Sequence, residues 1–282
     1  MYFDNQKMRN FENSIIESLR NEGIEAESVE IVKNGIPCKG VRICNMDGTV
    51  SPIIYYSEHE TVESIMSRIR DVLSTDTTSF GVERLTDWNY VKDHAYLSVQ
   101  KSGTEDIVKK PYLNLEIVLR IYLDLGDETG SVKVTNGLID QLGITEETAW
   151  KAACDNTRRH ISIRNMAEVL GGQPTDDDTL YVVTAGQHGG AAALYYKDVF
   201  REFCLDHGEA DVYILPSSTE EVLVIPGSKV GVMFSVLDLA QICDSITNSQ
   251  VEPIIQLEPA VYRFNLVEDT ISIAATADGE VV

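Results

Sequence analysis

The chain has 282 residues, enough to bury one large hydrophobic core or two modest ones. Hydrophobic residues make up 43% of it, and no run reaches the roughly 18 apolar residues that a membrane span needs. The formal net charge is -22, from 23 Lys and Arg against 45 Asp and Glu. A surface this acidic repels nucleic acids and anionic membranes and attracts basic surfaces, although dispersed acidic residues also serve solubility alone.

The cysteines and the N-terminus indicate a cytoplasmic protein. The five cysteines are an odd number spread along the chain, and none forms a close pair with metal-ligand spacing. The first residues lack the basic region followed by an apolar region that marks a signal peptide. We therefore predict reduced thiols, a cytoplasmic location, and neither metal nor cofactor.

The first 75 residues show the pattern of a small α-β-β-β-α unit. Two stretches carry apolar residues at helical spacing, and three short strand patterns lie between them. Asn34-Gly35 is the strongest short hairpin signal and joins the first two of these strands. The predicted helices are 5–21 and 61–73, and the predicted strands are 26–32, 36–44 and 49–56.

The clearest strand pattern covers residues 113–125. Seven apolar residues occupy every second position there, with Asn114, Glu116, Arg120 and Asp124 opposite them, and a helix would scatter the seven around its axis. A turn over 126–130 leads to a partner strand over 132–134. Residues 74–112, by contrast, are less regular, with one predicted strand over 94–100.

Two helices with clear caps follow the long strand. Thr135 is predicted to cap 137–142, and Thr145 to cap a longer helix through Trp150 and Cys154. That second helix ends on three basic residues at 158–160, where the helix dipole favours positive charge.

Residues 180–226 are the best organised part of the chain. Leu180–Thr184 is a β-branched strand, a glycine turn follows at 186–190, and Ala191–Tyr195 is predicted to return as a second strand. The other elements predicted here and downstream are helices over 165–170, 198–207 and 232–246, strands over 212–216 and 222–225, and a final strand pair over 261–266 and 270–274.

These elements predict an α+β fold. We expect mixed, mostly antiparallel sheets with helices packed on one face, in two sub-domains joined by the long strand pair. The expected division is 1–112 for the N-terminal unit and its connector, 113–179 for the long strand pair and helices, and 180–282 for the C-terminal unit.

A cysteine and two histidines are the candidates for catalysis. Cys204 with His188 or His207 could form a nucleophile and base, which would make the protein a hydrolase. However, Cys204 lies on the apolar stripe of its helix with Phe200, which favours a buried structural thiol. The dipole explains His207 at a helix end, and the glycine turn around His188 lacks the lysine of a phosphate-binding loop.

The candidate binding residues are charged. The aspartate run could hold a hard cation, but calcium-loop spacing is absent and a solvated loop explains it. The basic pair could contact a phosphate, although a helix C-terminus explains it without a ligand. The acidic residues near the C-terminus make that end locally negative. The candidates are Asp176, Asp177, Asp178, Arg158, Arg159, Glu252, Glu258, Glu268 and Asp269.

Three pieces of the chain together resemble a known family. They are residues 34–41, from Asn34-Gly-Ile-Pro, residues 142–150, from Leu142-Gly-Ile-Thr, and the organised region around Leu180–Thr184 and Val222–Pro226. This is similar to an uncharacterised family of gut Firmicute-type bacteria, encoded near conjugative and other mobile elements. The resemblance covers residues 8 to 265 and implies a bacterial cytoplasmic protein, and it carries no catalytic residues across.

Charge and resemblance together predict a non-enzymatic protein that binds a basic protein partner, and neither nucleic acid nor a membrane directly. Given the mobile-element setting that the resemblance implies, the sharpest form is a counter-defence inhibitor with a nucleic-acid-mimicking surface. A Cys/His-dependent hydrolase and a structural or assembly module are the alternatives.

Overall fold

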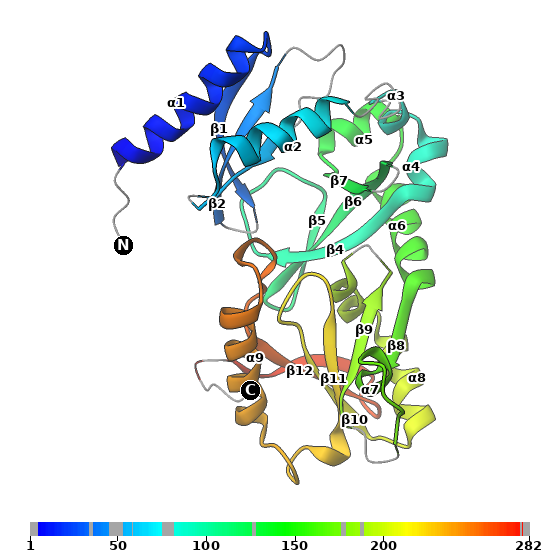
Figure 1. The fold of residues 1–282 in the computed structure, drawn as a ribbon. Helices are drawn as coiled ribbons and strands as arrows, with labels where there is room; N and C mark the ends of the chain where they lie inside the picture. Colours follow the sequence, from blue (N-terminus) through cyan, green and yellow to red (C-terminus); the bar gives the residue numbers. More distant parts are fainter. Residues whose placement is uncertain are drawn as a thin grey trace. The chain divides into compact units, whose positions relative to one another are not determined.

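The computed structural model divides the chain into two compact units, Met1–Asp87 and Trp88–Val282 (Figure 1). The residues that the structure describes are 5–33, 36–44, 53–57, 59–74, 82–125, 128–175, 179–186, 189–276 and 278. Within this described part, no helix combines the length and apolar character needed to cross a bilayer.

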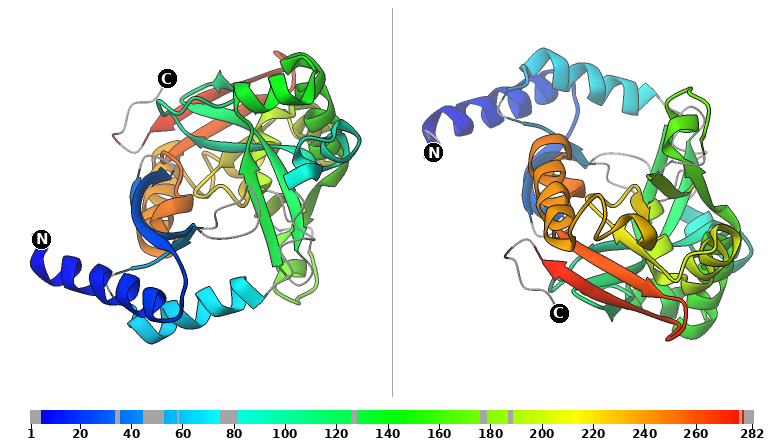
Figure 2. Two further views of the ribbon diagram at one scale, coloured as in Figure 1. Left: turned by 90° about the horizontal axis from the view of Figure 1, so that it is seen from above. Right: turned by 90° about the horizontal axis from the view of Figure 1, so that it is seen from below.

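The first unit is a three-stranded antiparallel sheet covered by two helices. Its strands are β1 (Ala26–Lys33), β2 (Ile36–Ile43) and β3 (Ile53–Tyr55), in that order, and its long helices are α1 (Asn5–Asn21) and α2 (Val62–Ser74). Figure 2 shows both helices along the same side of the sheet. The α-β-β-β-α prediction is confirmed. The fully buried core residues are Ile15, Leu19, Val41, Ile43, Ile65 and Ile69.

The second unit contains a four-stranded antiparallel sheet built around one long strand. Its strands are β4 (Ala95–Lys101), β5 (Lys109–Tyr112), β6 (Leu115–Leu125) and β7 (Glu128–Lys133), and β6 pairs with the other three. Alternate apolar residues from Leu115 to Ile121 are buried, which confirms the period-two prediction. β6 begins at Leu115 because Leu113 and Asn114 form the turn after β5, with Leu113 at φ 55°.

Helices of the second unit cover this sheet. They are α4 (Trp88–His94), α5 (Asn136–Leu142) and α6 (Glu146–His160), and the short α3 (Val82–Leu85) ends the first unit. The two predicted N-caps are confirmed, because the Thr135 and Thr145 side chains accept hydrogen bonds from Leu138 N and Thr148 N. α6 is tied to β4, since Leu97 N donates to buried Thr157 Oγ1 at 2.8 Å.

A six-stranded antiparallel sheet forms the rest of the second unit, in the order β13-β12-β10-β11-β9-β8. Helix α9 (Val236–Gln250) packs Leu239 and Cys243 against it, and α8 (Lys197–His207) packs Phe200 beside Phe264. The α+β prediction is confirmed. The strands are β8 (Ile161–Asn165), β9 (Tyr181–Ala185), β10 (Asp211–Leu215), β11 (Val222–Pro226), β12 (Ala260–Asn265) and β13 (Thr270–Thr276).

The return strand predicted at Ala191–Tyr195 is wrong, because this segment is a 3-10 helix, η1 (Gly190–Tyr195). Gly189 turns the chain at φ 78°, and Gly190 N then donates to Glu220 O at 2.7 Å. η1 is buried from Gly190 through Leu194 and contacts β4, β9 and β11. Its small side chains allow close packing against several elements at once. The sequence pattern of a strand carries no information about such packing.

Another difference from the sequence prediction is β8, which the sequence pattern did not indicate. It directly follows α6, whose C-terminal cap is formed by Ile161 N donating to Arg158 O. The short helix predicted after it is confirmed as α7 (Met166–Val169), capped by Asn165 Oδ1, which accepts from Ala167 N at 2.7 Å.

Two glycine substitutions should change stability in opposite directions. Gly190→Ala should lower the free energy of unfolding by about 3 kcal/mol. The added Cβ would clash with the Glu220 carbonyl oxygen and would lie 2.8 Å from Thr184 Cα. Gly137→Ala in α5 meets only Thr135 Oγ1, at 3.9 Å, so it should raise that energy by about 0.5–1 kcal/mol. Urea unfolding measures both, and a neutral Gly190→Ala would contradict the close packing of η1.

Candidate functional site

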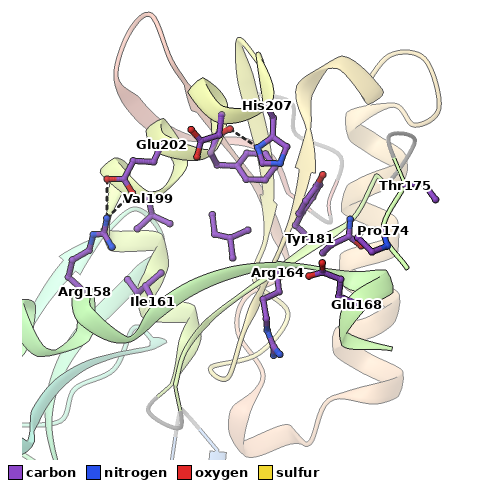
Figure 3. Close-up of a pocket in the computed structure, with 14 residues that line it drawn as sticks. Arg158, Ile161, Arg164, Glu168, Pro174, Thr175, Tyr181, Val199, Glu202 and His207 are labelled. Atoms are coloured by element: carbon purple, nitrogen blue, oxygen red, sulfur yellow. Dashed lines mark hydrogen bonds and ion pairs between the residues drawn. The ribbon is translucent and has the colours of Figure 1, made fainter. Parts of the chain in front are cut away.

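A pocket of about 650 Å³ lies in the second unit, along β8 and α8 (Figure 3). Ile161 and Ile163 of β8 and Val199 and Phe203 of α8 supply apolar lining. Charged residues and a histidine complete it. They are Arg158 at the end of α6, Arg164 on β8, Glu168 on α7, and Glu202, Asp206 and His207 on α8.

β8 borders the pocket because of its place at the edge of the six-stranded sheet. Among the strands that the structure describes it pairs with β9 alone, from Ile161↔Ala185 to Asn165↔Tyr181. Ile161 and Ile163 are half-buried, whereas the intervening Ser162 is exposed, as expected of a strand with one covered face. Four of the five residues of β8 line the pocket.

α8 supplies the opposite wall from a helix with two distinct faces. Val199, Phe200, Phe203 and Cys204 are its buried residues. Asp198, Glu202 and Asp206 follow one another at intervals of four, so their carboxylates lie one above another along the helix. Glu202 and Asp206 of this acidic row line the pocket.

Arg158 neutralises one end of the acidic row. Its Nε lies 2.5 Å from Asp198 Oδ2, and its second guanidinium nitrogen lies 3.0 Å from Glu202 Oε2. The hydrogen bond to Asp198 is the main reason that the pKa of Arg158 is raised. Among the described residues, by contrast, Asp206 and Glu168 have no ion-pair partner. The pocket therefore keeps unpaired negative charge.

Aromatic rings line the other end of the pocket (Figure 3). Tyr181 lies edge-on to Phe203 with ring centroids 4.8 Å apart, and the His207 ring stacks on Phe203 at 4.0 Å. His207 Nδ1 lies 2.9 Å from Phe203 O, which fixes the ring orientation. This end offers flat apolar surface next to the Asp206 and Glu168 carboxylates.

The Cys/His arrangement is not assembled among the described residues. The Cys204 side chain is fully buried, and its pKa is raised to about 11 by burial and then by the charges of Asp211 and Glu209. A nucleophilic cysteine needs a solvent-open thiol with a lowered pKa, so Cys204 lacks both properties. His207 lines the pocket, and His188 lies outside the described residues.

The predicted charged residues do not form one compact site. Asp269 accepts hydrogen bonds from Lys197 and Arg201, which lower its pKa. Arg158 lines the pocket, whereas Arg159 bonds within α6, to Asp155 O and Asn156 Oδ1. Asp176, Asp177 and Asp178 lie outside the described residues.

The remaining predicted acidic residues are separated by β12. Glu258 precedes this strand and Glu268 follows it, and six strand residues span about 20 Å. Glu258 lies 4.0 Å from Lys101 Nζ, and Glu252 directly precedes the short η3 helix (Pro253–Ile255) without a side-chain capping hydrogen bond. The structure therefore does not gather these carboxylates at one point.

Sequence reasoning missed the residues that make the pocket. Glu202 and Asp206 had a usable signal, because acidic residues recur every four positions beside the apolar stripe of the predicted helix 198–207. Ile161-Ser-Ile163 also alternates, although three residues are too short to predict a strand. Nothing local links Glu168 or Tyr181 to the pocket, since only the folded sheet brings them there.

The fold and the pocket define a class: an α+β protein whose candidate site lies between an edge strand and an acidic helix. No group of three or more metal-ligating side chains occurs in the part of the chain that the structure describes. The chain belongs to DUF5688, a family of unknown function whose model matches residues 5–265 and so spans both units. Neither a curated protein nor a solved structure matches it.

Thiol alkylation should distinguish a structural Cys204 from a catalytic one. In the native protein Cys44, which is exposed, should react first, and Cys204 and Cys243 should react only after unfolding, because both are buried and have pKa values raised to about 11. Mass spectrometry of iodoacetamide-treated protein, with and without denaturant, measures this order. Native labelling of Cys204 as fast as Cys44 would restore the hydrolase alternative.

Proposed function

We propose that this protein is a non-enzymatic binding protein that engages a basic segment of a protein partner through the pocket between β8 and α8. The observation that carries the proposal is the pair of unneutralised carboxylates, Asp206 and Glu168, on a pocket with apolar and aromatic lining. Lysine and arginine suit such a site, because their stems lie on apolar surface while their charged ends reach carboxylates.

The basic residues of the pocket do not cancel this preference. Arg158 already forms ion pairs with Asp198 and Glu202, so its positive charge is compensated within the protein. Figure 3 shows Arg164 pointing away from His207 and Tyr181. A cation that enters on the α8 side therefore meets Asp206 without a competing guanidinium.

The overall charge narrows the class of partner. At a net charge of -22 the protein steers toward positive surfaces, which can raise association rates by roughly 10- to 1,000-fold at low salt. Proteins that bind nucleic acids carry such surfaces. An inhibitor that occupies the nucleic-acid groove of its partner is the sharpest form of the proposal.

Removing one pocket carboxylate should weaken binding. Asp206→Asn should lower the affinity for lysine-rich peptides about 3- to 10-fold, because it deletes an unpaired charge from the α8 wall. The matched control is Asp140→Asn, which makes the same change at an exposed position of α5 and should alter affinity by less than about 2-fold. Isothermal titration at 50 and 200 mM salt measures both.

Two outcomes of that titration would contradict the proposal. Equal losses for both variants would mean that only total charge matters and the pocket has no role. Affinity that does not change between the two salt concentrations would mean that charge does not drive binding. A chain that bound no basic peptide and only formed oligomers would instead favour an assembly module.

A further inference from the structure

We infer that β8 takes up an extended basic segment of the partner as an additional strand, so that the six-stranded sheet grows by one strand at this edge. The inference rests on the proposed function and adds the mode of binding to it. Its evidence is the unused hydrogen-bonding edge of β8, the direction of α8 along it, and the spacing of the acidic row.

In the part of the chain that the structure describes, no strand pairs with one side of the β8 backbone. Met166 N donates to Leu180 O at 3.0 Å, one step beyond the Asn165↔Tyr181 pair. In an antiparallel ladder this bond makes Arg164↔Val182 and Ser162↔Thr184 the hydrogen-bonded pairs. Ile163 N–H and C=O therefore point away from β9, toward the edge where the sheet ends.

The pocket extends along this same edge. Arg158, which precedes β8, bonds Asp198 and Glu202 early in α8. Tyr181, which pairs with the last residue of β8, contacts Phe203 and His207 late in α8. β8 and α8 thus run side by side in the same direction, and a strand added to β8 would lie along the acidic row.

The spacing of that row suits a strand with alternating basic residues. Side chains on one face of a strand recur about every 6.7 Å, since each residue rises about 3.3 Å. Residues four apart in a helix are separated by about 6 Å along its axis. Glu202 and Asp206 are four apart. Among the described residues Asp206 is unpaired, and Glu202 shares the single positive charge of Arg158 with Asp198, so two successive lysines on the inner face of an added strand can each meet one carboxylate.

The other edge of the sheet lacks this combination. β13 ends the sheet on the far side, and its pairing with β12 shifts register at Val261 and Tyr262. Such irregularities are one way in which proteins protect an edge from unwanted pairing. β8 has regular pairing over all five residues and four of them line the pocket, which is the arrangement that strand addition requires.

Eight-residue peptides with uncharged ends test the mode of binding. The probe alternates lysine and valine. One control has four lysines followed by four valines, with equal charge, and a second alternates glutamate and valine. The alternating basic peptide should bind at least about 10-fold more tightly than the block peptide, and the acidic peptide should not bind. NMR of the full chain should show Ile163 N–H shifted and protected from exchange in the complex.

N-methylation of the peptide backbone provides a readout that leaves the protein unchanged. Methyl groups at alternate residues should weaken binding about 10-fold, because they remove the N–H that faces β8, and methyl groups at the intervening residues should change it less than about 2-fold. This period of two distinguishes added-strand pairing from side-chain attraction alone.

Each other outcome has a definite meaning. If basic peptides bind and weaken on Asp206→Asn but leave Ile163 N–H unchanged and show no period of two, strand addition is overturned and the proposed function stands. If no basic peptide binds, both fall. If β8 of a second copy, or the acidic peptide, protects Ile163 instead, strand addition by a basic segment is likewise overturned.

Discussion

The close packing of η1 is the constraint on which the second unit depends. Gly190 N donates to Glu220 O, while Leu194 O accepts a hydrogen bond from Tyr112 of β5 at 3.0 Å. Tyr196, directly after η1, donates from its hydroxyl to Cys154 O of α6 at 2.9 Å. Since α6 leads into β8 and Tyr196 precedes α8, one small-residue segment sets the positions of both pocket walls. The geometry of the candidate site therefore depends on how η1 packs.

Much of the fold could be predicted because its signals are local. The alternation that became β6 and the threonine caps of α5 and α6 are decided by neighbours in sequence. The η1 segment could not be predicted in the same way, because three alanines after glycine fit a strand or a helix equally well. Contacts with β4 and β11, which are distant in sequence, decide its conformation together with those to the neighbouring β9.

The candidate site was predicted less well than the fold, again for a physical reason. Arg158 and His207 were named as candidate site residues from the sequence, although a helix end explained each, and both line the pocket. Their interactions could not be read from the sequence, since Arg158 forms ion pairs with residues 40 and 44 positions away. The number of acidic residues could likewise be read from the sequence, but their positions in the fold could not. Asp198, Asp211 and Asp269 are all engaged with arginines, so part of the negative charge stabilises the fold and part is available to a partner.

The turn at Leu113 is flanked by two residues that hydrogen-bond outside the β5–β6 hairpin. A leucine at φ 55° costs about 1–2 kcal/mol relative to ordinary backbone, so the β5–β6 hairpin is a poor independent nucleus. On either side of Leu113, Tyr112 and Asn114 hydrogen-bond to Leu194 of η1 and Tyr262 of β12. The turn is therefore secured from outside its own hairpin. Residues 88–282 should consequently melt in a single cooperative step, with neither sheet persisting once the other is lost.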